Sequence, residues 1–212
     1  MIIVGLTGNL ASGKTLAAEL FRKKGAHVID ADAIARELTQ SNAKLKNAIL
    51  KIFGKEFAAG KGQIDRKKLA WHVFSDPKEL KKLNTIVHPG VIVEIYKQIE
   101  KFRSKKGIVV LDVPLLFESK MEKLADFTVV VKASEANMLS RASRRGIPAV
   151  LARRILAAQW PAMKKARLAD FVIDNNGSAE EFGRRIHQVI QDILKTQKSR
   201  EGGFFATAQK IK

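Results

Sequence analysis

The sequence predicts an α/β protein built on a parallel sheet. Short apolar runs of strand length alternate with segments of helical periodicity along most of the chain. The run Ile108–Leu111 is continuously apolar, as expected for a central strand that is covered on both faces. A glycine-rich loop directly follows the first run and opens a helical pattern. The predicted strands are residues 2–6, 26–29, 108–113, 127–131 and 171–173.

The loop Gly8–Thr15 has the spacing of a phosphate-binding P-loop. Gly8 and Gly13 allow tight turns, so that the backbone through Ala11 and Ser12 can line a phosphate-sized hollow at the start of a helix. Lys14 would reach the β- and γ-phosphates, and the hydroxyl of Thr15 would bind Mg²⁺. A glycine-rich turn before an ordinary helix is the alternative, but the preceding strand favours a nucleotide-phosphate site.

The composition favours a globular protein with an anionic ligand. Lys and Arg number 39 against 21 Asp and Glu, a net charge of +18, which suits an anionic substrate, a polyanion or simply a solvated basic surface. The chain has no Cys, which excludes disulfides and thiolate catalysis. No signal peptide or membrane-spanning run is recognisable, so we expect a soluble cytoplasmic protein without membrane association.

Three acids lie at or just beyond the carboxyl ends of predicted strands, where ligands gather in parallel α/β sheets. Asp30 is expected to cap the next helix, whereas Asp32 is favoured as a functional carboxylate over a second cap. Asp112 ends the central run, where it could hold Mg²⁺ through water or form a turn before proline.

Residues 41–103 read as helices without an intervening strand, which predicts a helical insertion between strands of the sheet. Asp65 is expected to cap one of these helices, and Asp76 another that has proline in its first turn. Arg66 and His88 stand out as polar groups near segment ends, although a lone His is more often structural.

Two arginine-bearing helices follow the fourth strand. Their arginines, separated by Gly146 and Pro148, could close like a lid on ATP phosphates or form a solvated basic face. Ser178 should cap a last amphipathic helix, and beyond Thr196 we expect a polar, basic and partly disordered tail. The arginines are Arg141, Arg144, Arg145, Arg153 and Arg154.

Several motifs in one order make the chain resemble the dephospho-CoA kinases, a family of nucleoside-monophosphate-kinase-like P-loop enzymes. The resemblance covers residues 2–178 and is specific because it does not depend on the P-loop alone. The matching segments are residues 6–15, Val28–Arg36, Ile64–Arg66, His88-Pro89, Val113–Glu118, Arg154 with Gln159, and Val172–Gly177.

The resemblance implies a P-loop three-layer α/β/α fold with a five-stranded parallel sheet, a helical CoA-binding insertion and a helical lid. It implies transfer of the γ-phosphoryl of ATP, with Mg²⁺, to the ribose 3′-hydroxyl of dephospho-CoA. Asp32 matches the presumed base, Arg141 the lid arginine and Asn175 part of the nucleotide site, while Arg66 and His88 fall in the substrate-binding part. The divisions are 1–40, 107–133 and 166–198 for the core, 41–106 for the insertion, 134–165 for the lid and 199–212 for the basic tail.

Two loop positions depart from the family pattern. Ala11 stands where glycine is usual, so we expect negative φ there, and Asn9 also replaces a common glycine. A nucleoside-monophosphate or other small-metabolite kinase remains an alternative. A nucleic-acid-binding ATPase is a further one, but 7% aromatic residues and no aromatic-basic signature argue against specific nucleic-acid binding. The oligomeric state is not predicted.

Overall fold

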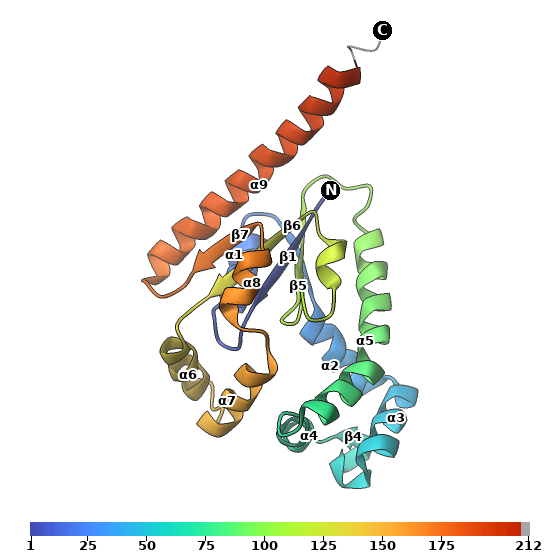
Figure 1. The fold of residues 1–212 in the computed structure, drawn as a ribbon. Coiled ribbons are helices and arrows are strands. Elements are labelled where there is room, and N and C mark those ends of the chain that lie inside the picture. Colours follow the sequence, from blue (N-terminus) through green and yellow to red (C-terminus); the bar gives the residue numbers. More distant parts are fainter. Residues whose placement is uncertain (209–212) are drawn as a thin grey trace.

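The computed structural model describes the backbone of residues 1–208, and the side chains of these except residues 61 and 200–208. Its centre is a sheet of five parallel strands in the order β2-β5-β1-β6-β7 (Figure 1). β1 lies at the middle, where Ile2 pairs with Ile108 of β5 and Val4 with Phe127 of β6. The strands are β1 Ile2–Gly8, β2 His27–Asp30, β5 Ile108–Asp112, β6 Phe127–Lys132 and β7 Phe171–Asp174.

Both faces of the central strands are buried, which confirms the three-layer prediction. In β1, Val4 and Leu6 have no exposed surface and pack in the cluster that contains Phe21 of α1 (Lys14–Lys23). Successive side chains of a strand point to opposite faces, so Ile3 packs in a second cluster instead. The sheet is therefore an internal layer between two cores.

Helices α1 and α9 (Ala179–Ala208) cover one face of the sheet (Figure 1). Ser178 and Glu181 form the predicted cap of α9, because the amide of each donates to the side chain of the other. The helix continues to Ala208, so the irregular tail expected beyond Thr196 is wrong up to that residue; residues 209–212 lie outside the described part. The basic residues there do not interrupt helical backbone geometry.

The predicted insertion is mainly helical, and it extends from α2, which follows β2. Asp65 and Asp76 cap α4 and α5 as predicted, with their carboxylates accepting bonds from the amides of Lys68 and Lys78. Its helices are α3 Ala43–Phe53, α4 Arg66–Val73 and α5 Pro77–Glu100, with the 3-10 turns η1 Lys55–Phe57 and η2 Gly60–Gly62, and α2 Ala31–Ser41 joins β2 to it.

Two details of the insertion correct the sequence prediction. The strands β3 (Ala58–Ala59) and β4 (Gln63–Ile64) form a small antiparallel pair, where no strand was expected. Such two-residue strands are too short to show a period-2 pattern. Pro89 lies inside α5, where it removes a helical N–H and α5 is visibly bent (Figure 1), so His88 is in mid-helix rather than near a segment end.

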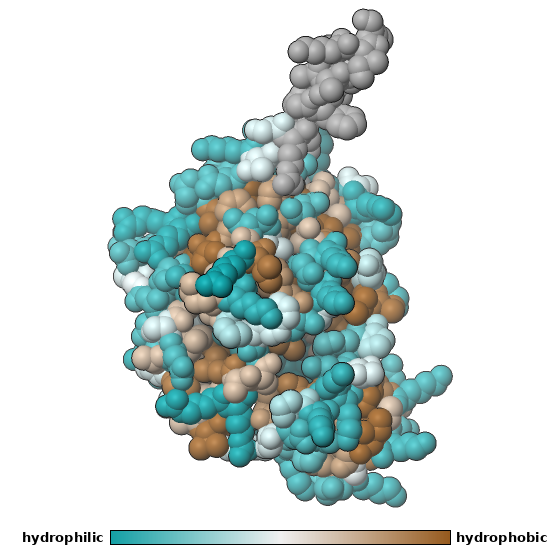
Figure 2. Space-filling model, in the orientation of Figure 1, coloured by the Kyte–Doolittle hydropathy of each residue, from teal (hydrophilic) through white to brown (hydrophobic). Residues whose placement is uncertain are grey.

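The predicted lid consists of α6 (Glu135–Arg144) and α7 (Ala149–Ala158), with Trp160-Pro161 separating α7 from α8 (Ala162–Leu168) as expected. The lid and the insertion project from the same end of the sheet (Figure 1). A further 3-10 turn, η3 (Met121–Leu124), precedes β6. The face seen in Figure 2 is mostly hydrophilic, with scattered apolar patches.

Candidate active site

The glycine-rich loop joins β1 to α1 at the carboxyl end of the sheet. Gly13 has φ of 108°, and a Cβ atom there would collide with the side chain of Asn175. A Cβ on Gly8 would collide with Ser12 Oγ and would lie 2.6 Å from the carbonyl oxygen of Val131. The two motif glycines are therefore required by the close approach of the neighbouring chain as well as by the turn itself.

Ala11 corrects a prediction, because its φ is +56° and not negative. Left-handed backbone costs a non-glycine residue roughly 1–2 kcal/mol. The methyl group is buried and belongs to a small apolar cluster with Ala142 of α6 and Ala152 of α7. This packing against the lid offsets the backbone cost, and no local sequence signal indicates it.

Lys14 forms an ion pair with Asp112, the last residue of β5, at 2.5 Å between Nζ and Oδ1. The carboxylate is almost completely buried, and this burial raises the pKa of Asp112, while the charge and hydrogen bond of Lys14 oppose the rise. Asp112 is thus a partner of the loop lysine rather than a turn-forming residue. The pair therefore places a buried negative charge beside the cation of the loop.

Asp32 lies in the first turn of α2, one residue after Ala31 begins the helix. Asp30 is the N-cap, as predicted, because its Oδ1 accepts from the amide of Ala33 at 3.0 Å. The Asp32 side chain opens onto the cavity, yet the surrounding protein displaces much of its water, and this raises its pKa. Lys14 lowers the pKa of Asp32 and Asp30 raises it, so a carboxylate that accepts protons more readily than usual lies within the field of the loop lysine.

Arg66 and His88 approach the same cavity from the insertion. Arg66 is the first residue of α4, and partial burial together with Arg36 lowers its pKa, although it remains a cation at neutral pH. His88 is half-buried in α5, and burial lowers its pKa, so the neutral ring is favoured. At neutral pH a cationic Arg66 and a neutral His88 can therefore both form hydrogen bonds with a polar ligand.

A single cavity of about 510 Å³ joins these groups. At one end it is lined by the P-loop with Lys14 and Thr15, and at the other by apolar residues of the insertion. Asp32 lies on its wall, together with Arg66 and His88. The large apolar residues that the insertion contributes to the lining are Ile49, Ile64, Leu69, Val73, Phe74, Leu80, Leu83, Val87, Val91 and Ile92.

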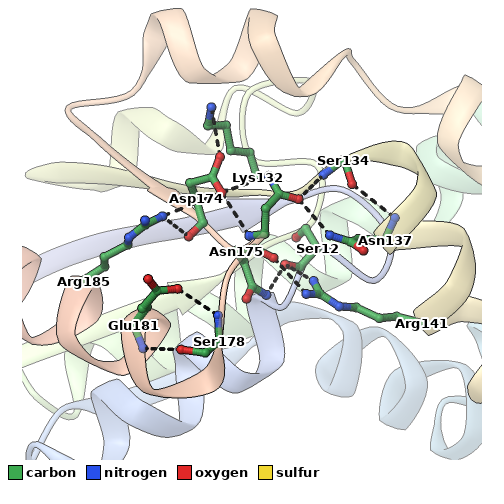
Figure 3. A network of polar contacts seen from close by, with 11 residues as sticks. Ser12, Lys132, Ser134, Asn137, Arg141, Asp174, Asn175, Ser178, Glu181 and Arg185 are labelled. Carbon is green, nitrogen blue, oxygen red and sulfur yellow. Dashed lines mark hydrogen bonds and ion pairs between the residues drawn. The ribbon is translucent and has the colours of Figure 1, made fainter.

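Three predicted site residues, Ser12, Asn175 and Arg141, do not line that cavity but meet behind the P-loop (Figure 3). The side-chain amide of Asn175 and the guanidinium of Arg141 both donate to the carbonyl oxygen of Ser12, at 2.7 and 3.4 Å. Arg141 also donates to the carbonyl oxygen of Asn175 at 2.8 Å. In this structure these side chains brace the loop backbone.

The lid also contacts the insertion directly. Arg154 of α7 donates to Ser75 Oγ at 2.6 Å, and its guanidinium lies 5.7 Å from the ring centroid of Trp71 in α4. This contact bridges the two parts that project from the sheet. The sequence indicated Arg154 as one of five lid arginines and, with Gln159, as part of the family resemblance, but it did not predict this contact.

The fold gives several residues contacts at the site that the sequence did not predict. Arg145 lines the cavity, one helical turn after Arg141, and Gln159 bonds the P-loop amide of Leu10 at 2.9 Å. Lys165 is completely buried against Glu118. The family motif at Val113–Glu118 could have pointed to Glu118. No pattern in the sequence indicated that Lys165 is buried, because a lysine is usually exposed.

Within the described residues, no group of three or more His, Cys, Asp or Glu side chains could hold a metal ion. The described helices are also too short or too polar to cross a bilayer. A Mg²⁺ ion that binds with nucleotide phosphates needs only one or two protein oxygens besides phosphate and water, so a P-loop hydroxyl such as that of Thr15, which lines the cavity, fits it. The glycine cradle likewise fits a phosphate group.

The parallel sheet, the P-loop and the carboxylate on the cavity wall define a P-loop kinase. Residues 2–181 match the dephospho-CoA kinase family (CoaE), and the chain belongs to that family. It therefore acts in the last step of coenzyme A synthesis, the phosphorylation of dephospho-CoA.

Known proteins agree over most of the chain. It is 41% identical over 192 residues to dephospho-CoA kinase of Carboxydothermus hydrogenoformans, with 89% of this chain and 93% of that protein covered. The dephospho-CoA kinase structure from Campylobacter jejuni is 28% identical, with a TM-score of 0.66 and coverage of 92% and 98%. A crystal structure from Thermus thermophilus is 34% identical, with a TM-score of 0.73 and coverage of 90% and 97%.

Proposed function

We propose that this chain moves the γ-phosphoryl group of ATP onto the ribose 3′-hydroxyl of dephospho-CoA at the point where Asp32 faces the P-loop. The observation that carries the proposal is the continuity of the cavity. One end offers a phosphate cradle, the other an apolar chamber, and a carboxylate lies on the wall between them. Phosphoryl transfer depends on such alignment of donor and acceptor more than on covalent help from the protein.

On the donor side, the backbone from Gly8 to Thr15 would hold the ATP phosphates. Lys14 would leave Asp112 at least in part and place its ammonium against the β- and γ-phosphates. Bound Mg²⁺ would supply positive charge to the transferring group, and the hydroxyl of Thr15 would hold the ion, with Asp112 as a candidate ligand through water. Lys14 is thus the catalytic cation that the fold supplies.

Asp32 would orient the acceptor hydroxyl and take its proton late in the reaction. Because its pKa is raised, its carboxylate accepts a proton more readily than an ordinary Asp. Lys14 opposes that rise, because its positive charge favours the ionised form of the carboxylate. Kinetically, kcat should fall as the pH is lowered through the raised pKa.

On the acceptor side, Arg66 and His88 would bind the polar part of dephospho-CoA, and the apolar chamber would take the pantetheine arm. Binding energy from this remote arm would position the 3′-hydroxyl beside Asp32. Adenosine monophosphate lacks the arm and cannot fill the chamber. The size of the insertion therefore favours dephospho-CoA over the alternative kinase substrates.

Arg141 is the proposed lid arginine. It would leave the carbonyl oxygens it now contacts, or hold the loop that the nucleotide binds, while Arg145 offers a second guanidinium on the cavity wall. Asn175 would contribute to the nucleotide site by holding the P-loop. The division into core, insertion and lid at residues 41–106 and 134–165 remains part of this proposal.

We further propose a cytoplasmic location and no specific nucleic-acid partner. The net charge of +18 would attract polyanions weakly and in a salt-dependent way. The substrates themselves carry several negative charges, so a basic surface has a use without nucleic acid.

The deciding experiment compares acceptors in one buffer near physiological salt. We expect transfer from ATP to dephospho-CoA to exceed transfer to AMP or adenosine by orders of magnitude. Equal rates with AMP would favour a nucleoside-monophosphate kinase. ATP hydrolysis stimulated by DNA or RNA, without transfer to dephospho-CoA, would overturn the proposal.

A further inference from the structure

Lys165 in α8 is a completely buried lysine to which the proposed transfer assigns no role. Its Nζ donates to Glu118 Oε1 and to the carbonyl oxygen of Pro114, both at 2.9 Å. Burying an ammonium is unfavourable, and a buried partner offsets this only in part. The presence of a buried ion pair is thus weak evidence that it stabilises the fold. The hydrogen bonds that Lys165 and Glu118 make to other segments indicate a further role.

One connection leads to the phosphate loop. Glu118 Oε1 also accepts from the amide of Trp160 at 2.9 Å, and the carbonyl oxygen of Trp160 accepts from Asn9 Nδ2 at 3.0 Å. One residue earlier, Gln159 Oε1 accepts from the amide of Leu10 at 2.9 Å. The segment after α7 is thereby held against the tip of the P-loop by two hydrogen bonds, and Glu118 holds that segment in turn.

The other connection leads to the opposite wall of the cavity. The carbonyl oxygen of Pro114 accepts from Lys165 and also from Thr7 Oγ1, at 3.0 Å, at the end of β1. Pro114 lines the cavity, and its neighbours Val113 and Leu116 belong to the apolar core that is shared with the insertion. A shift of Pro114 would therefore move the wall between the sheet and the acceptor chamber.

We propose that Lys165 and Glu118 are positioning residues. They fix the position of the cavity wall at Pro114 relative to the tip of the P-loop at Asn9 and Leu10. Neither side chain needs to touch substrate. Their hydrogen bonds join the donor and acceptor sides through one buried ammonium. The inference rests on the proposed function only for the identity of the acceptor.

The surroundings of the pair agree with this role. Burial lowers the pKa of Lys165, Glu118 raises it, and the charge of Lys14 lowers it further, so the two lysines are within electrostatic reach. The second carboxylate oxygen, Glu118 Oε2, is buried and has no hydrogen-bond partner.

The test uses Lys165→Met, Glu118→Gln and the double variant, with Arg167→Met as the matched control, because Arg167 is an exposed cation on the same helix. Melting temperature, ATP affinity by calorimetry, and kcat and KM with both substrates are measured for each. Wild-type protein is assayed first, since a wild type that fails to phosphorylate dephospho-CoA refutes the proposed function and not the positioning role.

We expect Lys165→Met to melt lower, because it leaves Glu118 buried without a counter-charge, and the double variant to regain most of that loss. In the double variant, kcat should remain reduced on the order of 10²-fold, since a misplacement of about 1 Å can cost that much. ATP affinity should change little, and the control should match wild type.

Three results would overturn the proposal. In the first, the double variant recovers kcat together with its melting temperature. In the second, the variants lose ATP affinity while kcat is unchanged. In the third, the double variant does not fold although no charge is left buried, which would make the pair an element of stability only.

Discussion

Around the P-loop, polar groups are bonded to distant parts of the chain. Lys14 pairs with Asp112, and the carbonyl oxygen of Ser12 accepts from two side chains. The insertion end of the cavity is lined mainly by apolar side chains, and its polar exceptions are Thr39, Arg66, Asn84 and His88. The phosphate cradle is thus preformed by directional bonds, whereas the acceptor chamber is shaped by non-directional packing. This contrast suits a common triphosphate at one end and a long, partly apolar substrate at the other.

The largest effect is expected at the donor end, from Lys14→Ala. Removal of a cation that contacts a transferring phosphoryl group should lower kcat by about 10³–10⁵ for every acceptor. The measurement is steady-state turnover with dephospho-CoA, together with the melting temperature. Turnover near that of wild type at an unchanged melting temperature would disprove the P-loop assignment.

Asp32→Asn tests the carboxylate that lies between the phosphate end and the acceptor end of the cavity. Loss of the base should lower kcat by roughly 10²–10⁴, equivalent to about 3–5 kcal/mol of barrier, with little change in ATP affinity. If ATP binding collapsed instead and turnover per bound ATP were preserved, Asp32 would have a structural role.

The same variant makes a prediction for stability. Because the folded-state pKa of Asp32 is raised, the folded protein binds more protons than the unfolded chain between the ordinary and the raised pKa. The free energy of unfolding of the wild type therefore falls as the pH rises through that window. Asp32→Asn should lack this fall and melt at or above the wild-type temperature at neutral pH. A clearly lower melting temperature of Asp32→Asn at neutral pH would contradict the expected direction of this pH dependence.

A smaller effect is expected from the lid, and it separates Arg141 from Arg145. Arg145→Ala should lower kcat by roughly 10²–10³ with ATP affinity nearly unchanged, if a guanidinium on the cavity wall contacts the transferring group. Arg141→Ala should also weaken ATP binding. The substitution removes the hydrogen bonds that Arg141 donates to the carbonyl oxygens of Ser12 and Asn175, and these bonds brace the P-loop. The measurements are ATP affinity by calorimetry and kcat for both variants. If the two variants lost ATP affinity and kcat equally, the contacts of Arg141 with Ser12 and Asn175 would not contribute to ATP binding.

The smallest effect is expected at the acceptor end, from Leu83→Asp. A carboxylate in the apolar wall should lower kcat/KM for dephospho-CoA by roughly 10–100-fold, since such a mismatch costs about 1–3 kcal/mol. ATP affinity should be unaffected. Ile52→Asp is the control, because Ile52 is exposed on α3 of the same insertion. An equal loss in the control would indicate damage to the fold rather than to the chamber.

Much of the fold could be predicted because its signals are local. A continuously apolar run such as Ile108–Leu111 requires cover on both faces, and the caps at Asp65 and Asp76 follow from side chains that reach amides two or three residues ahead. Where the signal was short or absent, prediction failed. The hairpin of β3 and β4 has too few residues to show a period, and the bent helix α5 continues through Pro89.

By itself, the sequence determined the P-loop, the order of strands and helices, and the family, since spacing along the chain carries each of these. Tertiary structure alone decided the left-handed backbone of Ala11, whose methyl group is held by two lid helices. It also decided that Lys14 meets Asp112, 98 residues away, and that Lys165 is buried against Glu118. Local patterns report backbone preference and amphipathic period, whereas strain and buried charge persist only where distant segments supply the compensating contact.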